Sequence, residues 1–228
     1  MIRFFIASFF TIIALMVNAQ EKPSKQFCGW AFNDTTAIKN KMTKQFNFLH
    51  IKENDSIADI GSSSGSYEAC IAAVSNYKNI HFTLVDIDTK CLNRTKVNKM
   101  LQHYSIVKND SITWQLSIVN NTADSLHLPA NSYNNVWLMN TLHEIEDKQK
   151  IIQQIAAIMK RGGELVLLEL LSRPKHTIHG GCKKKLMDEN ELQILLEQNG
   201  FTKEDELYNP NDVKKVINPV YLVRFRKN

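Results

Sequence analysis

The sequence lacks an internal repeat, a low-complexity tract and any break in composition along its 228 residues. These absences exclude a repeat architecture and leave no sign of a second folded domain. Hydrophobic residues make up 43% of the chain, so one domain of this length can bury a substantial core. We therefore expect a single domain.

A strong charge of one sign is also absent. The formal net charge is +5, and Arg3 is the only charged residue among the first 19. A chain that begins at Gln20 would therefore carry one positive charge fewer. Such a mild excess gives little support to nucleic-acid binding, which needs a concentrated basic surface. We expect no nucleic-acid partner.

No hydrophobic run is long enough to cross a membrane comfortably. The mainly apolar run at 4–17 follows Arg3 and ends in Val17-Asn18-Ala19, a pattern typical of a secretory signal cleaved after Ala19. The sequence thus predicts a signal peptide at 1–19, a linker at 20–33 and one folded domain at 34–228. We expect export to the periplasm or medium. The alternative is an uncleaved anchor that leaves the domain in the cytoplasm, with membrane contact only through this segment.

Cysteine is scarce. The four residues, Cys28, Cys70, Cys91 and Cys182, all follow the predicted cleavage site, and an even number in an oxidising compartment permits disulfides. Cys70 falls on the apolar face of a predicted helix, and the spacing is typical of scattered core thiols. We expect at most one disulfide bond.

The most informative segment present is SIADIGSSSGSY at 56–67, where an apolar run ends in Asp59 and a turn with Gly61 and Gly65 leads into a helical pattern. Glycine lets a ligand approach the backbone, and the helix start offers free N–H groups. A carboxylate repels phosphate but attracts an ammonium, which favours a nucleoside with a positive group. The missing G-x-G-x-x-G spacing counts against a dinucleotide-dependent oxidoreductase, the less favoured alternative.

A second acid follows in the order that a nucleoside site requires. The strand-like run HFTLVDID at 81–88 ends near Asp86, where a carboxylate can bond ribose hydroxyls. Alternatively, Asp86 or Asp88 only caps a helix that begins near Thr89.

Strand and helix patterns alternate along the rest of the chain. A helix is predicted at 35–50, and strands are predicted near Ser56, His81, Ile112, Asn134 and Glu164, with helices between most of them. This alternation indicates a parallel sheet covered on both faces. The consecutive strand candidates at 201–208 and 216–226 predict a terminal hairpin.

Three later segments complete a family pattern: ADSLHLPANSYNNVWLMNTLHEIED at 123–147, MKRGGELVLLEL at 159–170 and LLEQNGF at 195–201. With the first two motifs they resemble, in order, the class I S-adenosylmethionine-dependent methyltransferases over about 34–226. The resemblance implies a Rossmann-like, doubly wound, mostly parallel seven-stranded sheet with the last strand antiparallel. It also implies S-adenosyl-L-methionine as cofactor and methyl transfer to an acceptor.

The resemblance assigns roles by position. Asp59 and the two glycines would hold the methionine part of the cofactor, Asp86 the ribose and Asp124 the adenine, although Asp124 alternatively is a solvated loop acid. Asn140 would lie beside the sulfonium. The implied cofactor-binding residues are Asp59, Gly61, Ser62, Ser63, Gly65, Asp86, Ile87, Asp124, Ser125 and Asn140.

One departure concerns the turn itself. Ser63 stands where the family has its middle glycine, so affinity for the cofactor is expected to be reduced. Together with export, this substitution makes an inactive ligand-binding module of the same fold the main alternative to an enzyme.

His143 and Glu144 are the candidates for acid–base catalysis, because they follow the fourth strand and imidazole titrates near neutrality. Alternatively His143 only shapes the loop, since transfer to a good nucleophile needs mainly alignment. The loop lacks the Asn/Asp-Pro-Pro-aromatic signature used on amide nitrogens and the Pro-Cys pair used on bases. A small-molecule acceptor is therefore favoured.

The segment KHTIHGGCKKK at 175–185 brings together His176, His179 and Cys182, which could supply three ligands to zinc. No fourth ligand is evident. The favoured interpretation is a mobile substrate lid with glycine hinges, and no metal is assigned.

Overall fold

The computed structural model describes residues 28–29, 31–210 and 217–228. The predicted signal peptide and most of the predicted linker lie outside these residues. Seven strands form one sheet in the order β3-β2-β1-β4-β5-β7-β6. The strands are β1 (Ser56–Ile60), β2 (His81–Asp86), β3 (Gln115–Asn120), β4 (Tyr133–Met139), β5 (Met159–Leu170), β6 (Phe201–Tyr208) and β7 (Val220–Lys227).

Pairing within the sheet is parallel from β3 to β5, and β7 runs antiparallel to both β5 and β6. This arrangement confirms the predicted doubly wound fold with an antiparallel last strand and a terminal hairpin. The helices are α1 (Thr35–Phe48), α2 (Ser66–Val74), α3 (Arg94–Lys108), α4 (Lys148–Ile158) and α5 (Glu189–Glu197), with a 3-10 turn η1 at Leu142–Glu144.

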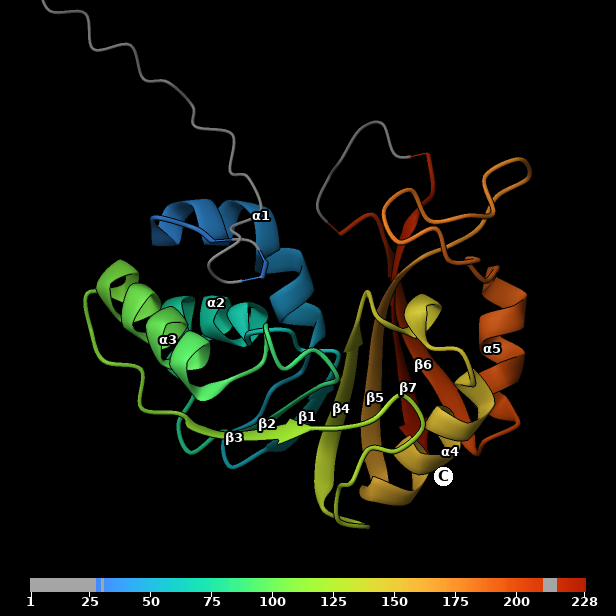
Figure 1. The fold of residues 1–228 in the computed structure, drawn as a ribbon, viewed down its shortest axis with the longest axis horizontal. Coiled ribbons are helices and arrows are strands. Elements are labelled where there is room, and N and C mark those ends of the chain that lie inside the picture. The colour runs from blue at the N-terminus through green and yellow to red at the C-terminus, as the bar shows by residue number, and fades with distance from the viewer. Residues whose placement is uncertain (1–27, 30, 211–216) are drawn as a thin grey trace, which may run out of the picture.

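Helices cover both faces of the sheet: α1, α2 and α3 lie on one side, and α4 and α5 on the other (Figure 1). The strands supply both cores by alternation, because successive side chains of a strand point to opposite faces. On β4, for example, Trp137 packs in the α1–α3 core and Val136 in the α4–α5 core, and both are fully buried. This layering fixes the positions of the loops that carry the candidate site.

The helix after β2 begins later than expected. Asn93 is its N-cap and accepts a hydrogen bond from Lys96 N at 3.0 Å, so α3 starts at Arg94 rather than near Thr89. Asp88 instead accepts from Lys90 N at 2.8 Å within the intervening turn. The interpretation of Asp86 or Asp88 as a helix cap was therefore wrong.

Two other expected boundaries also shift. The third strand begins at Gln115 rather than near Ile112, and the first helix ends at Phe48 rather than at residue 50.

The end of the predicted linker is part of the folded domain. Cys28 forms a disulfide with Cys91, and Phe32 is 4% exposed, its N–H donating to the Tyr104 hydroxyl at 3.2 Å. Cys70 is buried as predicted and is not part of a disulfide, so the expectation of at most one bridge is met. In the part of the chain that the structure describes, no helix has both the length and the apolar character that a membrane crossing requires.

Candidate active site

The predicted ligand residues follow the carboxyl ends of parallel strands that share one edge of the sheet. The strand order reverses between β1 and β4, and open α/β sheets bind their ligands at such a reversal. The loop after β1 wraps over the end of β2: Gly61 N and Ser62 N both donate to Val85 O, at 2.8 and 3.1 Å. Ser63 N then donates to Asp86 Oδ2 at 2.7 Å.

Asp86 therefore joins the turn to the second strand. Its other oxygen, Oδ1, accepts from Asp88 N at 2.8 Å. Because each carboxylate oxygen has more than one lone pair, both can still accept bonds from ribose hydroxyls. The side chain is held in one orientation before any ligand arrives.

Packing explains the two glycines of the turn better than ligand approach does. Both have positive φ, 83° at Gly61 and 75° at Gly65. An added Cβ would lie 2.3 Å from Thr141 Oγ1 at Gly61 and 2.6 Å from Leu84 Cδ1 at Gly65. The turn thus needs glycine because the loop after β4 and strand β2 press against it.

Ser63 also adopts a positive φ, 54°, where a side chain is disfavoured. Its hydroxyl points to the N-terminal segment and donates to Cys28 O at 3.0 Å. This bond shows how a serine is accommodated at the position of the family's middle glycine.

A buried pair of carboxyl groups lies beneath the turn. Asp59 and Glu68 are each 1% exposed, and Asp59 Oδ1 and both Glu68 oxygens have no hydrogen-bond donor among the described residues. Burial raises the pKa of both groups, and for Asp59 the neighbouring Glu68 charge raises it further. The two can bond to each other only if one carries a proton. An ammonium group would satisfy them better, since it supplies donors and positive charge together.

The start of α2 complements this pair. Its N-cap is Gly65, which has no side chain to bond the first N–H groups of the helix. Free N–H groups at a helix start attract a carboxylate. Buried acids and an uncapped helix start together suit the ammonium and carboxylate of an amino acid, so these residues fit the methionine part of the expected cofactor.

The remaining predicted cofactor residues lie on neighbouring loops. Ile87 is 60% exposed directly after Asp86, and Asn140 follows β4 with its N–H donated to Leu168 O at 2.6 Å. Asp124 lies on the loop after β3 and accepts from Thr122 Oγ1 at 2.7 Å and Lys150 Nζ at 3.3 Å. These bonds hold the pKa of Asp124 below its ordinary value.

Only part of the predicted set is brought into direct contact. The turn after β1 touches Asp86, whereas Asp124 is exposed, and its neighbour Ser125 pairs with Thr122. The cofactor-binding roles of all the predicted residues stay predictions.

His143 is buried in the turn after β4. It is 3% exposed, and its Nδ1 lies 2.8 Å from Glu169 Oε2. The second oxygen of Glu169 accepts from Leu142 N at 2.5 Å, so one carboxylate fixes both the turn and the imidazole ring. We did not predict Glu169 from the sequence. The sequence feature that could have indicated Glu169 is an acidic residue inside the apolar run of β5.

The bond to Glu169 sets the chemistry of the imidazole. A carboxylate beside Nδ1 keeps the proton there, which leaves a lone pair on Nε2. This Nε2 is buried without a partner among the described residues, and Glu144 Oε1 lies 3.8 Å away on a side chain that is 56% exposed. His143 can therefore act as a base or as a metal ligand, and Glu144 faces solvent beside it.

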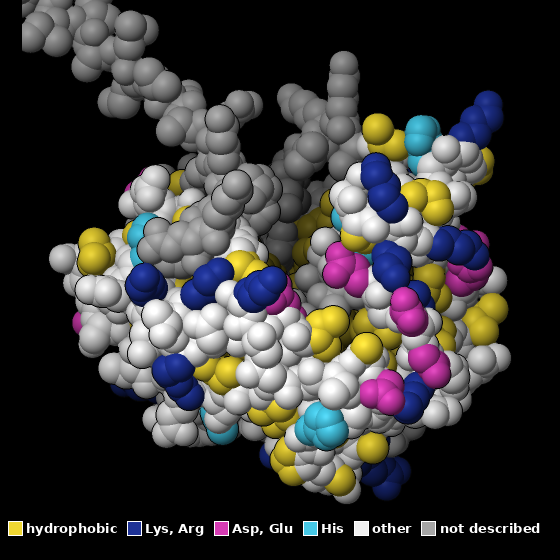
Figure 2. All heavy atoms as spheres, in the orientation of Figure 1, with side chains coloured by type: hydrophobic (Ala, Val, Ile, Leu, Met, Phe, Trp, Pro, Cys, Tyr) yellow, Lys and Arg dark blue, Asp and Glu magenta, His cyan; other side chains and the backbone are white. Residues whose placement is uncertain are grey.

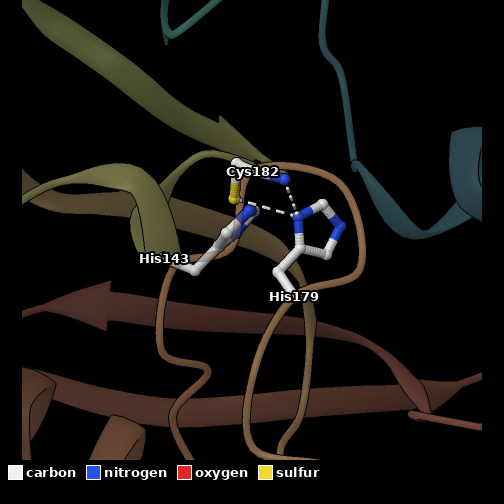
Figure 3. Close-up of side chains that lie close together, drawn as sticks. All are labelled: His143, His179 and Cys182. Atoms are coloured by element: carbon white, nitrogen blue, oxygen red, sulfur yellow. Dashed lines mark hydrogen bonds between the residues drawn. The ribbon is translucent and has the colours of Figure 1, made fainter.

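The loop between β5 and α5 folds back onto this turn. His179 and Cys182 point toward His143, with His179 Nδ1 3.0 Å from Cys182 Sγ and the two histidine rings 4.6 Å apart (Figure 3). Burial, helped by the nearby His143, lowers the pKa of His179. His176 is exposed and lies outside the group, so His143 takes the place that the sequence suggested for it.

Two cavities lie near His143 and over the helices α4 and α5. A cavity of about 10 Å³ borders His143, Glu169 and Met187. A groove of about 460 Å³ borders Lys148, Lys185 and Met187 over α4 and α5, away from the turn after β1. Basic and acidic side chains lie side by side over that part of the surface (Figure 2). None of the residues that border these cavities is a predicted cofactor residue.

Comparison with known proteins gives one family match. Residues 58–167 match the model of a methyltransferase domain. The chain is also 23% identical over 183 residues to a carboxy-S-adenosyl-L-methionine synthase of Staphylococcus epidermidis, a match that covers 80% of this chain and 72% of that protein.

Solved structures share the fold at low identity. A methyltransferase from Aquifex aeolicus that depends on S-adenosylmethionine superimposes with a TM-score of 0.63 at 14% identity, covering 87% of this chain and all of that one. Another from Methanosarcina mazei gives 0.62 at 15% identity, covering 79% and 96%. At this identity the likeness concerns the fold.

Proposed function

Since this chain belongs to the class I S-adenosylmethionine-dependent methyltransferases, we propose that it transfers a methyl group to a small-molecule acceptor. S-adenosylmethionine is its cofactor and supplies, when bound, a methyl group on a positively charged sulfur. The observation that carries the proposal is the bond from Ser63 N to Asp86, which sets the turn and the ribose acid in one unit.

Different groups of the site would bind different parts of the cofactor. Asp59 and Glu68 would receive the ammonium group, and the uncapped start of α2 the carboxylate. Asp86 would bond the ribose, and the exposed Ile87 offers apolar surface to the adenine. These assignments rest on the chemistry of each group.

The acceptor is expected to lie beside the turn after β4. His143 offers an unprotonated Nε2 that can take a proton from an oxygen, nitrogen or sulfur of the acceptor. Glu169 keeps the ring in the required tautomer and orientation. The loop carrying His179 folds over His143, which favours an acceptor small enough to pass beneath it.

A labelling experiment tests this function. The protein is incubated with methyl-labelled S-adenosylmethionine and a cell extract that is then separated by size. We expect the label in the small-molecule fraction, and much less of it with the Asp86→Ala variant when the cofactor concentration does not exceed its dissociation constant for the unmodified protein. Label confined to macromolecules would contradict the proposal. Mass spectrometry of the nucleosides would also detect a carboxylated cofactor, the product in the name of the Staphylococcus relative.

We also propose that the protein is exported. The apolar N-terminal run supports this, and so does the disulfide between Cys28 and Cys91, because disulfides persist mainly in oxidising compartments. Mass spectrometry of the native protein should find a chain that begins at Gln20 and contains this bond. A chain that keeps residues 1–19 and carries both thiols reduced would contradict export.

A further inference from the structure

Three side chains that bind transition metals converge at one point. The candidate ligand atoms of His143, His179 and Cys182 all lie within 4.8 Å of one another (Figure 3). They come from two segments, the turn after β4 and the loop after β5, that are more than thirty residues apart in the sequence. Of the residues that the structure describes, these three alone form such a group.

Each histidine of the group has one nitrogen that is not a donor to another residue. Nδ1 of His143 bonds Glu169, so its Nε2 is the free acceptor. Nδ1 of His179 accepts from Cys182 N at 3.3 Å, so this nitrogen too is unprotonated. Two lone pairs and a sulfur therefore share a small space, and Nε2 of His143 is buried there without a described partner. A cation would satisfy all three atoms at once.

Nearby positive charges are directed elsewhere. Lys183 Nζ donates to Gly180 O at 2.7 Å, and Lys184 Nζ pairs with Glu146 at 3.3 Å. Two acids, Glu144 and Glu169, lie next to His143. These two carboxylates attract a cation.

Glu169 supplies a further feature of metal sites. A histidine ligand commonly donates its second ring N–H to a carboxylate, which fixes the ring and strengthens the nitrogen as a ligand. Glu169 is 4% exposed and makes this contact to His143 at 2.8 Å.

The loop can close the remaining distance. Bonds of about 2.0–2.3 Å in a tetrahedral zinc site place ligand atoms roughly 3.3–3.7 Å apart. His179 Nδ1 and Cys182 Sγ are 3.0 Å apart and would separate by a few tenths of an ångström, whereas the distances to His143, at most 4.8 Å, would shorten by up to about 1–1.5 Å. Gly180 and Gly181 separate the two loop ligands, and no described atom lies within 4 Å of where a Gly180 Cβ would be.

We propose that His143, His179 and Cys182 bind one Zn²⁺ ion and leave its fourth position open. Imidazole and thiolate are the ligands that zinc prefers, and three protein ligands with one open position are typical of catalytic rather than structural sites. The sequence favoured a mobile substrate lid for this loop. A bound metal would instead hold the loop against the turn after β4.

The site also bears on the acceptor, a consequence that rests on the proposed function. Thr141, two residues before His143, packs against Gly61 of the cofactor turn. With Zn²⁺ on its Nε2, His143 could not also take a proton, so an oxygen or sulfur atom of the acceptor bound at the open position would be activated by the metal instead. Metal binding itself does not depend on methyl transfer.

Metal titration of the full chain tests the site directly. Protein stripped with a chelator, with the Cys28–Cys91 disulfide kept intact, is titrated with Zn²⁺ in the calorimeter and with Co²⁺ in the spectrophotometer. We expect one equivalent of either ion and a thiolate-to-cobalt charge-transfer band. No cofactor is present, so failure here leaves the proposed methyltransferase function untouched.

Variants assign the ligands. His179→Ala and Cys182→Ala should each weaken Zn²⁺ binding on the order of 100-fold or more, and Cys182→Ala should abolish the band; Glu169→Gln should cost about 10–100-fold. His176→Ala, in the same loop but outside the group, is the matched control and should change nothing. Zn²⁺ binding by the unmodified protein without the cobalt band, or an affinity of the His179→Ala or Cys182→Ala variant equal to that of the unmodified protein, would overturn the proposal.

Discussion

Individual carboxyl groups of the site differ in what they bond. Asp86 accepts two backbone N–H groups, whereas Asp59 Oδ1 and both Glu68 oxygens have no donor among the described residues. A carboxylate bonded in this way is already ordered, so it can bond a ligand without further loss of freedom. The unbonded pair instead gains most when a positive ligand arrives.

Replacing Asp86 should weaken cofactor binding. We expect Asp86→Ala to cost about 1.5–3 kcal/mol, or roughly 10–150-fold in the dissociation constant, because hydrogen bonds to a charged group are lost. Asp88→Ala is the control, since that acid bonds only Lys90 N in the adjacent turn. Calorimetric titration measures both. An unchanged constant in Asp86→Ala would show that Asp86 does not bind the cofactor.

The buried pair makes stability depend on pH. The pKa values of Asp59 and Glu68 are raised in the folded protein above their ordinary values of 3.8 and 4.5. Above those values the folded state holds more protons than the unfolded state, so the free energy of unfolding falls as pH rises toward the folded pKa. Glu68→Gln should make this fall smaller.

Urea unfolding at pH 5 and pH 8 measures the effect. Asp124→Asn is the control, because that acid is exposed and its pKa is lowered rather than raised. An identical difference between the two pH values in wild type and Glu68→Gln would refute the contribution of the pair.

Some site residues could be predicted from the sequence, and others depend on contacts between distant segments. Asp59 and Asp86 were found because each ends a strand-like run at the expected spacing. Glu169 and Thr141 were missed, because their roles come from contacts with His143 and Gly61 that no local pattern encodes. The sequence likewise did not indicate that His143 lies beside His179 and Cys182, because these residues meet only in the folded chain.

Loss of the disulfide that holds the N-terminal segment to the domain should strongly lower the stability of the protein. The Cys28–Cys91 bond closes a loop over 63 residues of sequence, which contains β1, α2 and β2. Cross-linking a loop of this size restricts the unfolded chain.

Cys28→Ser with Cys91→Ser should lower the free energy of unfolding by about 4 kcal/mol. Cys182→Ser, measured with a chelator present, is the control because its thiol is not in a disulfide. Urea unfolding measures both variants. A loss no greater in the double variant than in the control would show that the bond adds no stability.

The accuracy of the predicted boundaries differs from element to element: the first helix starts at Thr35 as predicted, whereas β3 and α3 start later than expected. The strands β1 and β2 are apolar runs that are buried along most of their length, and the predicted terminal hairpin is present as β6 and β7. The start of α3 was wrong because several residues before Asn93 form a turn, and Asp88 resembles a cap in sequence. When several possible N-cap residues lie close together in a sequence, only the backbone conformation shows which of them caps the helix.

The fold as a whole follows from patterns that the sequence states repeatedly. Alternating strands and helices specify a sheet covered on both faces, and the sheet order then places five loops at one edge. The tethering of Cys28 and Phe32 to the domain was not predicted, because it depends on one disulfide and on the burial of Phe32. The part of the site that would bind the acceptor was likewise not predicted, because it depends on how the loop after β5 folds back onto the turn after β4.

Calorimetric titration of the folded chain with S-adenosylmethionine, and with its demethylated product, tests the cofactor site most directly. We predict saturable binding of both with dissociation constants on the order of micromolar, and no comparable binding of NAD. Protein that is folded by circular dichroism yet takes up neither compound at about 1 mM, or that binds NAD tightly instead, would contradict it.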